Sequence, residues 1–443
     1  MARMHDVIVL GAGVAGSATA KLLAEKGWDT LLVDRHRFPK HKVCGEFLSP
    51  ESQDTLSRIG LLEEIKPLSP SLIANAAIYM RGGNAIRFTL PAPGFGLSRY
   101  RLDSSLHHAA LSAGAQLRQG ETAVALERDE QGYIVYLRNG QQVEQLRARL
   151  VISACGGTGG PSLGTSGSLM TDGGLQREGQ ASFRPPFLSQ SRYSGNKTQR
   201  RDSVAQGLVG VKMHFEYAGK RESDFDTKGD DVDPESTLAR YKRNGAESAA
   251  IEGIVELYFF RGGYAGLNAI EDGRVNVAAL LDKRELPKGG QSVIAMLEEA
   301  ANRHPRLKER LDSMKPLHET AAAVSPVRIS PNPVPWKSGP LVGDAICRIP
   351  PLCGDGMSMA LRSSELCAMY ADRLLKGDCT IADLERGYSA AISAEFAGPL
   401  KWGVFAQSLL SSPLLASVLP GLARLAPGAV VGMFQATRLR AIK

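Results

Sequence analysis

The chain has few cysteines and no long apolar run, and both absences exclude whole classes of protein. Its six cysteines in 443 residues include no C-x-x-C pair, so a disulfide scaffold is excluded and free thiols in a reducing cytoplasm are expected. No apolar stretch approaches the roughly 18 uninterrupted residues of a transmembrane helix, and the amino terminus lacks the pattern of a secretory signal. We therefore expect a cytoplasmic protein without a membrane-spanning segment.

Aromatic residues are also scarce, at 6% of a chain that is 43% hydrophobic and 22% charged. This balance is typical of a globular protein, and the length suits two or three domains. The net charge is +7, but the basic residues are scattered, so nucleic-acid binding is not expected. The histidines show no zinc-site spacing and the Ser-Gly strings lie in low-complexity sequence, so we expect neither a metal site nor a serine hydrolase.

The amino-terminal part reads as a strand, a glycine-rich turn, a helix and a second strand. Two apolar runs frame the sequence Gly-Ala-Gly-Val-Ala-Gly at residues 11–16, and the second run ends at Asp34. In such a βαβ unit Gly11 allows the tight turn, Gly13 lets a pyrophosphate approach the backbone, and Gly16 lets the helix pack closely. The start of the helix binds phosphates, and Asp34 would accept hydrogen bonds from ribose hydroxyls. The motif predicts an adenine dinucleotide but does not say which one.

A second glycine turn lies near the other end of the chain. A predicted strand ends at Gly343-Asp344, and Gly354 and Gly356 precede a helix predicted over residues 358–375. A glycine turn at a helix start can bind an anion or a polar ring, and Asp344 could bind the hydroxyls of an extended cofactor. We interpret the two glycine turns as two ends of one binding site.

Taken together, these motifs resemble the flavoprotein superfamily of para-hydroxybenzoate hydroxylase, with geranylgeranyl reductases and flavin-dependent halogenases as its nearer branches. The resemblance covers residues 1–155 and 255–375, and it implies FAD as the cofactor and NAD(P)H or a reduced-flavin donor as the electron source. It also implies an α/β fold: a Rossmann-type FAD-binding domain with a parallel sheet and helices, an antiparallel-sheet substrate domain and a C-terminal helical region. The residues that the resemblance assigns to the cofactor are Gly11, Ala12, Gly13, Ala15, Gly16, Asp34, Arg35, Cys44, Gly45, Arg101, Ala123, Gly343, Asp344, Pro351, Gly354, Gly356 and Met357.

Three of the matching residues receive particular roles from the same resemblance. Cys44, in a Cys-Gly segment, resembles the thiol that reductases place beside the flavin ring, where it would tune or gate reduction as a catalytic residue; the alternative is packing. Arg101, near the start of a predicted helix, would approach the phosphates or the ribityl chain. Tyr264 lies in a Gly-Tyr turn that borders flavin and substrate in the family, so it is predicted to contact substrate, with sheet packing as the alternative. The family's usual tryptophan is missing from this turn, which would widen the cavity.

The predicted domains are discontinuous in sequence. Their boundaries are 1–70, 99–155 and 320–378 for the FAD-binding domain, 71–98 and 207–319 for the substrate domain, and 379–443 for the C-terminal helical region. That last region is expected to form a helical cap over the substrate domain, and the alternative is a surface that meets a membrane or admits a greasy substrate.

Two stretches, 156–206 and 219–253, are poor in periodic apolar residues. Such compositions bury too little apolar surface to order a core, so we expect irregular insertions with one helix near residues 235–243. A lid over the active site is the alternative for them.

The resemblance leaves the reaction open. The leading expectation is transfer of a hydride through reduced FAD to a double bond of a hydrophobic small molecule, as in geranylgeranyl reductases. The alternatives are an FAD-dependent monooxygenase that hydroxylates an aromatic or polyketide-like molecule, and a noncatalytic flavin-binding protein. Hydroxylases of the family carry an Asp-Gly pair where this chain has Ala154-Cys155-Gly156, which weakens the monooxygenase alternative, and the halogenase tryptophan pair is absent. The sequence predicts no particular oligomeric state.

Overall fold

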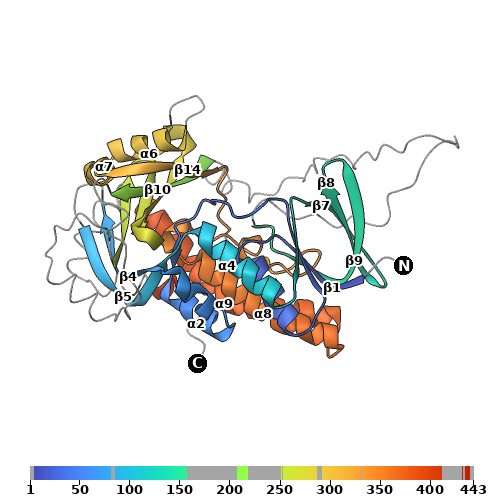
Figure 1. The fold of residues 1–443 in the computed structure, drawn as a ribbon. Helices are drawn as coiled ribbons and strands as arrows, with labels where there is room; N and C mark the ends of the chain where they lie inside the picture. Colours follow the sequence, from blue (N-terminus) through green and yellow to red (C-terminus); the bar gives the residue numbers. More distant parts are fainter. Residues whose placement is uncertain are drawn as a thin grey trace, which may run out of the picture.

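The protein is described by a computed structural model that covers residues 4–80, 85–156, 207–217, 251, 253–286, 292–330, 332–411, 432 and 435–439. This part of the chain contains two β-sheets, sheet A and sheet B, which lie towards opposite ends of the long helices α8 (Gly356–Lys376) and α9 (Ile381–Ser411) (Figure 1).

Sheet A has the strand order β6-β2-β1-β9-β8-β7. Its parallel part consists of β6 (Gln116–Gln119), β2 (Thr30–Asp34), β1 (Met4–Leu10) and β9 (Gln142–Ser153), and the hairpin of β7 (Thr122–Asp129) and β8 (Gly132–Asn139) extends it antiparallel to β9. The predicted parallel sheet is confirmed. The apolar runs of β1 and β2 are buried, as expected of strands that helices cover. The strand expected before Gly343 is reduced to one bridge, between Leu341 and Ser153.

Sheet B has the order β14-β10-β13-β12-β11-β4-β5-β3. Its strands are β3 (Phe47–Leu48), β4 (Ser71–Tyr79), β5 (Ala85–Gly96), β10 (Leu208–Tyr217), β11 (Gly253–Phe260), β12 (Gly263–Ala269), β13 (Val275–Asp282) and β14 (Met314–Val324). The pairs are antiparallel, as predicted, with the exception of β11 and β4, which run parallel. No hairpin joins these two strands, and the chain between them includes β6 to β9 of sheet A, so hairpin geometry does not determine their relative direction.

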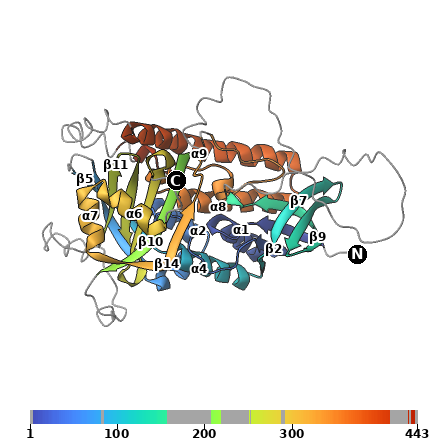
Figure 2. The same cartoon turned by 90° about the horizontal axis from the view of Figure 1, so that it is seen from above.

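Helices pack against both sheets. α1 (Val14–Glu25) and α4 (Arg99–Ser112) lie beside sheet A, while α6 (Val293–Asn302) and α7 (Pro305–Asp312) cover one face of sheet B (Figure 2). The helix predicted over residues 358–375 is confirmed as α8, and the predicted C-terminal helical region contains α9. The expected packing of α9 over the substrate domain is wrong, because its buried Tyr388, Ile392 and Phe396 join the core around α8 and sheet A. The shorter helical elements are α2 (Pro50–Arg58), α3 (Leu62–Ile65) and the 3-10 turns Lys66–Leu68, Glu271–Gly273, Lys283–Glu285, Gly343–Ala345 and Pro351–Cys353.

Some elements cross the predicted domain boundaries. β14 continues through the boundary expected between residues 319 and 320, and β3, from the segment assigned to the FAD-binding domain, pairs with β5 in sheet B. Most of the two predicted insertions, including the helix expected near 235–243, lies outside the described residues. Among the described helices, none is both long and apolar enough to cross a membrane.

Candidate functional site

One cavity of about 890 Å³ joins the two glycine turns. This volume is at the upper end of the roughly 300–1,000 Å³ that ligand pockets span, and residues of both sheets and of the loop before α8 form its wall. The predicted site residues that line it are Gly11, Gly13, Ala15, Asp34, Arg35, Cys44, Gly45, Ala123, Tyr264, Gly343, Asp344, Pro351, Gly354, Gly356 and Met357. Ala12, Gly16 and Arg101 are not on its wall.

The first glycine turn is held in shape from behind. A Cβ atom on Gly16 would lie 1.8 Å from the Gly11 carbonyl oxygen, and Gly11 itself has φ +104°, which favours glycine. The Ala12 N–H donates to the Asp34 carboxylate at 2.8 Å, which ties the turn to the end of β2. Ala12 and Gly16 therefore support the turn, while Gly11 and Gly13 face the cavity.

Three positive groups meet where the turn enters α1. A Cβ on Gly13 would have no closer neighbours than Arg99 Nη2 at 3.6 Å and Lys42 Nζ at 3.8 Å, so both cations point to the same spot as the helix start. Arg99 is buried and donates to Asp103 at 2.9 and 2.8 Å. Burial alone would lower the pKa of Arg99, but Asp103 outweighs it and raises the pKa. A charged arginine, a lysine and the unpaired N–H groups of a helix start together fit a pyrophosphate.

Arg101 lies on another side of α4. Its guanidinium donates to Asp272 at 2.6 Å and lies 3.7 Å from Glu271, with 39% of the side chain exposed. Two residues along an α-helix differ by about 200° in direction, so Arg99 and Arg101 cannot both face the cavity. The structure places Arg99, not Arg101, on the cavity wall. The spacing of Arg99 and Asp103, four residues apart on one helix face, is the sequence signal that could have found it.

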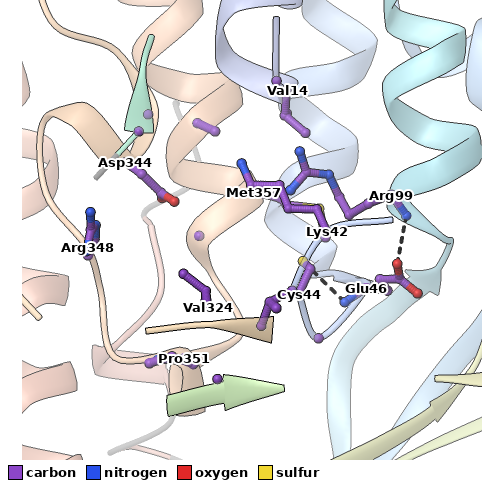
Figure 3. A pocket seen from close by; sticks show the side chains of 18 of the residues that line it. Val14, Lys42, Cys44, Glu46, Arg99, Val324, Asp344, Arg348, Pro351 and Met357 are labelled. Carbon is purple, nitrogen blue, oxygen red and sulfur yellow. Dashed lines mark hydrogen bonds between the residues drawn. The ribbon is translucent and has the colours of Figure 1, made fainter. Parts of the chain in front are cut away.

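The second glycine turn is fixed as firmly as the first. Gly343 has φ +60°, and a Cβ there would lie 2.7 Å from the Ala15 Cβ. The buried Asp355, before α8, accepts from Ser49 Oγ at 2.7 Å and from Arg438 Nη1 at 3.3 Å, which anchors the loop. Asp344 extends into the cavity opposite Arg99 and Lys42 (Figure 3).

Cys44 sits on the cavity wall where the loop before β3 contacts sheet B. Its carbonyl accepts from Asn276 Nδ2 at 3.1 Å, and its sulfur accepts from the Glu46 N–H at 3.4 Å (Figure 3). Burial raises the pKa of the Cys44 thiol, so the group is a neutral thiol at pH 7.

The part of the cavity that faces sheet B is apolar. Its wall includes Ala76, Ile78, Phe88, Leu90, Val255, Leu257 and Leu280. Tyr264 lies at this wall with 9% of its surface exposed, and its buried hydroxyl has no hydrogen-bond partner within the described residues. Gly266, two residues later, also lines the cavity, and a Cβ there would lie 3.2 Å from Leu257 Cδ2.

These residues fit FAD. Two rigid glycine turns face one cavity and cations surround one helix start, as the phosphates of an extended dinucleotide require. Asp34 at the end of β2 and Asp344 in the turn Gly343–Ala345 offer carboxylates for its hydroxyls. Within the described ranges, no three His, Cys, Asp or Glu side chains are grouped to hold a metal ion.

Comparison with known proteins also indicates an FAD-binding domain. Residues 4–177 match the family model described as an FAD binding domain. The chain is 26% identical over 413 residues to digeranylgeranylglycerophospholipid reductase 2 of Methanopyrus kandleri, covering 92% of this chain and 86% of that protein. The fold resembles a myxobacterial chondrochloren halogenase with a TM-score of 0.67 at 18% identity, over 99% of this chain and 91% of the other.

A menaquinone reductase of Mycobacterium tuberculosis is 33% identical over 138 residues, which are 30% of this chain. The match spans only about a third (33%) of that relative's own length. The amino-terminal part of this chain thus matches an FAD binding domain. The predicted resemblance to geranylgeranyl reductase-like and halogenase-like flavoproteins is confirmed.

Proposed function

We propose that the protein is an FAD-dependent reductase that adds hydrogen across a carbon–carbon double bond of a hydrophobic small molecule. The observation that carries this proposal is the continuity of one cavity from the cationic glycine turn to the apolar wall of sheet B. A cofactor bound at the polar end of the cavity, formed by the first glycine turn, Lys42 and Arg99, would place its ring next to a hydrophobic molecule that contacts the apolar wall of sheet B. The long match to a reductase named for a phospholipid with geranylgeranyl chains supports the same chemistry.

The residues of the polar end have separable tasks in this proposal. Arg99, Lys42 and the N–H groups at the start of α1 bind the phosphates of FAD, and Asp34 and Asp344 accept hydrogen bonds from its hydroxyls. When bound, FAD supplies the two-electron hydride chemistry that side chains lack.

The remaining walls orient the ring and the substrate. The N–H groups at the start of α8 stabilise negative charge beside the cofactor, and Cys44 contributes a neutral thiol to the same wall. Tyr264 and its apolar neighbours exclude water from the substrate.

A visible spectrum followed by anaerobic turnover tests the proposal. The purified protein should be yellow, and NADPH or a reduced-flavin donor should bleach it without oxygen. Adding a digeranylgeranylglycerophospholipid in detergent, or menaquinone, should then restore the oxidised spectrum and give a product heavier by two hydrogens. Oxygen consumption coupled to substrate would instead establish the monooxygenase alternative. A bound flavin that no donor reduces would indicate the noncatalytic alternative.

We also propose that the C-terminal helical region contacts a membrane surface. Trp402 and Phe405 of α9 are 46% and 53% exposed, and their rings meet edge to face at 5.7 Å. Exposed aromatic rings favour the interface between water and lipid. Replacing both with serine should weaken co-sedimentation with anionic phospholipid vesicles, whereas Leu111→Ser, which changes an equally exposed apolar residue on α4, should not. Equal binding by all three proteins would contradict this contact.

A further inference from the structure

A buried cluster of ionisable side chains lies behind the Cys44 loop. Glu46, Lys212 and His214 are each at most 1% exposed. Lys212 Nζ lies 3.0 Å from Glu46 Oε1 and 2.7 Å from His214 Nε2, and His214 Nε2 lies 2.5 Å from Glu46 Oε2. Removing such groups from water is costly unless they are paired. These three side chains pair with one another and are not among the groups assigned above to the cofactor or to the substrate.

The cluster can arrange its protons in more than one way. His214 Nε2 faces both Glu46 and Lys212, but a ring nitrogen either donates or accepts one hydrogen bond. It donates to the Glu46 carboxylate in one arrangement and accepts from the Lys212 ammonium in the other. Glu46 also accepts from the Arg99 backbone N–H at 3.0 Å, so its carboxylate keeps a fixed position in both. The cluster is therefore able to hold and release a proton without moving.

His41 connects this cluster to the cavity. Its Nδ1 lies 3.4 Å from Lys212 Nζ, and the His41 side chain lines the cavity. The ring stacks on Tyr100 at 4.9 Å and meets the His214 ring edge to face at 5.2 Å. Lys212 is thus one hydrogen bond away from a residue of the cavity wall.

The charges around His41 keep its ring neutral. Burial, Lys212 and His214 lower its pKa to about 4, against the smaller opposing influence of Glu46 and Glu319. A neutral ring whose Nδ1 accepts from Lys212 carries its proton on Nε2. Such a ring can give up the Nε2 proton and take another at Nδ1, so it passes protons rather than storing them.

Lys212 is the group that stores the proton. Burial lowers the pKa of Lys212, while Glu46 and Glu271 act in the opposite direction. Because burial disfavours its charged form, the Lys212 ammonium is a better acid than that of a surface lysine. The neutral amine that remains after proton loss is stable in a buried site.

We propose that His41 and Lys212 form a proton path into the cavity that completes the reduction of the substrate. The inference rests on the proposed function. A hydride, with its electron pair, adds to one carbon of the double bond, and the His41 Nε2 proton adds to the other carbon. As this proton leaves, Lys212 gives its own proton to His41 Nδ1, so the ring stays neutral and Lys212 becomes a neutral amine. After the product leaves, His41 Nε2 takes a proton from water and Nδ1 returns one to Lys212. Reduced FAD is the reductant, and the sum is two electrons and two hydrogens added to the substrate.

The resting protein tests the geometry without any turnover. Nitrogen-15 spectra of histidine-labelled protein loaded with FAD should show His41 as the neutral form protonated on Nε2 at pH 7. Lys212→Met should raise the pKa of His41, because it removes a neighbouring positive charge. A double variant, Lys212→Met with Glu46→Gln, removes both charges and serves if the single variant fails to fold. A His41 that is protonated on Nδ1, or whose pKa is insensitive to Lys212, would overturn the path.

Turnover then tests the role. His41→Gln should slow substrate reduction by roughly 100-fold, the lower range for loss of a general acid, while reduction of the bound flavin by NADPH keeps its native rate. Added imidazole should restore part of the lost rate. His108→Gln, which removes an exposed histidine of α4, is the matched control. Native turnover in His41→Gln would overturn the path alone, whereas a native protein that reduces no alkene would overturn the proposed function and this role with it.

Discussion

The two sheets differ in what they bury, and the difference separates their tasks. The central strand of sheet A is apolar, with Val7, Ile8 and Val9 at 0% exposure. Sheet B instead buries polar and charged side chains within its strands. Lys212 and Glu256 are at most 1% exposed there, and each is paired with an opposite charge.

The comparison shows two ways of building one site. Sheet A contributes through backbone shape, because the turn that follows β1 contains two glycines, Gly11 and Gly16, at which a Cβ would clash with backbone atoms. Sheet B contributes through buried polar and charged groups that bind the loop containing Cys44. Lys212 of β10 pairs with Glu46 of this loop, and Asn276 of β13 donates to the Cys44 carbonyl. Changes in the sheet A part should therefore act by steric exclusion at any pH, and changes in the sheet B part by electrostatics that depend on pH.

The strongest test of the steric half compares two glycines of one turn. Gly16→Ala places a Cβ 1.8 Å from a backbone oxygen, so the turn must shift. We expect a loss of about 3 kcal/mol in unfolding free energy and no retained FAD. Gly13→Ala meets nothing closer than 3.6 Å, so it should fold normally and lose only affinity for FAD. Thermal unfolding of the apoproteins and titration of flavin fluorescence separate the two effects; a Gly16→Ala protein that binds FAD normally would break the comparison.

The electrostatic half is tested by Lys212→Met, which leaves the Glu46 carboxylate buried without its ammonium. Loss of one partner of a buried pair costs about 3–5 kcal/mol. Lys308→Met breaks an exposed pair with Asp312 and should cost less than about 1 kcal/mol. Urea unfolding at pH 7 measures both, and similar losses would remove the distinction between the sheets.

The same lysine should determine how stability responds to acid. Burial would raise the pKa of Glu46, but His214 and Lys212 outweigh it and lower the pKa. Glu46 therefore contributes stability above its ordinary pKa of roughly 4.5, and this is lost as pH falls through the lower folded-state value. In Lys212→Met the folded-state pKa rises, so the loss should begin at a higher pH. Unfolding curves between pH 3 and pH 7 compare the two proteins, and identical acid limbs would contradict this coupling.

A smaller effect distinguishes the two arginines of α4. The paired change Arg99→Gln with Asp103→Asn removes a buried ion pair without leaving a lone charge. It should weaken FAD binding by roughly 10- to 100-fold, as expected when charged hydrogen bonds worth about 1.5–3 kcal/mol are lost. Arg101→Gln breaks the contact with Asp272 and should leave FAD affinity within about twofold of the native value. Equal effects in a flavin titration would return Arg101 to the cofactor.

The smallest expected effect on turnover is at Cys44, in the loop before β3. Cys44→Ala should retain FAD and alter turnover by about tenfold, which corresponds to roughly 1.4 kcal/mol. Cys379→Ala, a half-buried cysteine in the connection between α8 and α9, is the control and should alter neither. Unchanged kinetics in Cys44→Ala would assign the residue to packing.

The prediction of α4 was right about the helix and incomplete about its faces. The sequence predicts a helix that begins near Arg101, and α4 begins at Arg99. Whether Arg99 or Arg101 faces the cavity depends on the rotation of the helix about its axis. Packing against α1 and the pairing with Glu271 and Asp272 decide that rotation, and Asp272 lies 171 residues along the chain from Arg101.

Local pattern alone determined the glycine turns, because a turn with no room for a Cβ constrains the identity of its own residues wherever the chain goes next. Only the tertiary structure decided that the two turns share one cavity, that β11 runs parallel to β4, and that Lys212 meets Glu46 across 166 residues of sequence. Buried charges have no periodicity of their own. Their partners are selected by how the sheets pack, because a charge inside a protein is stable only where an opposite charge is brought within reach.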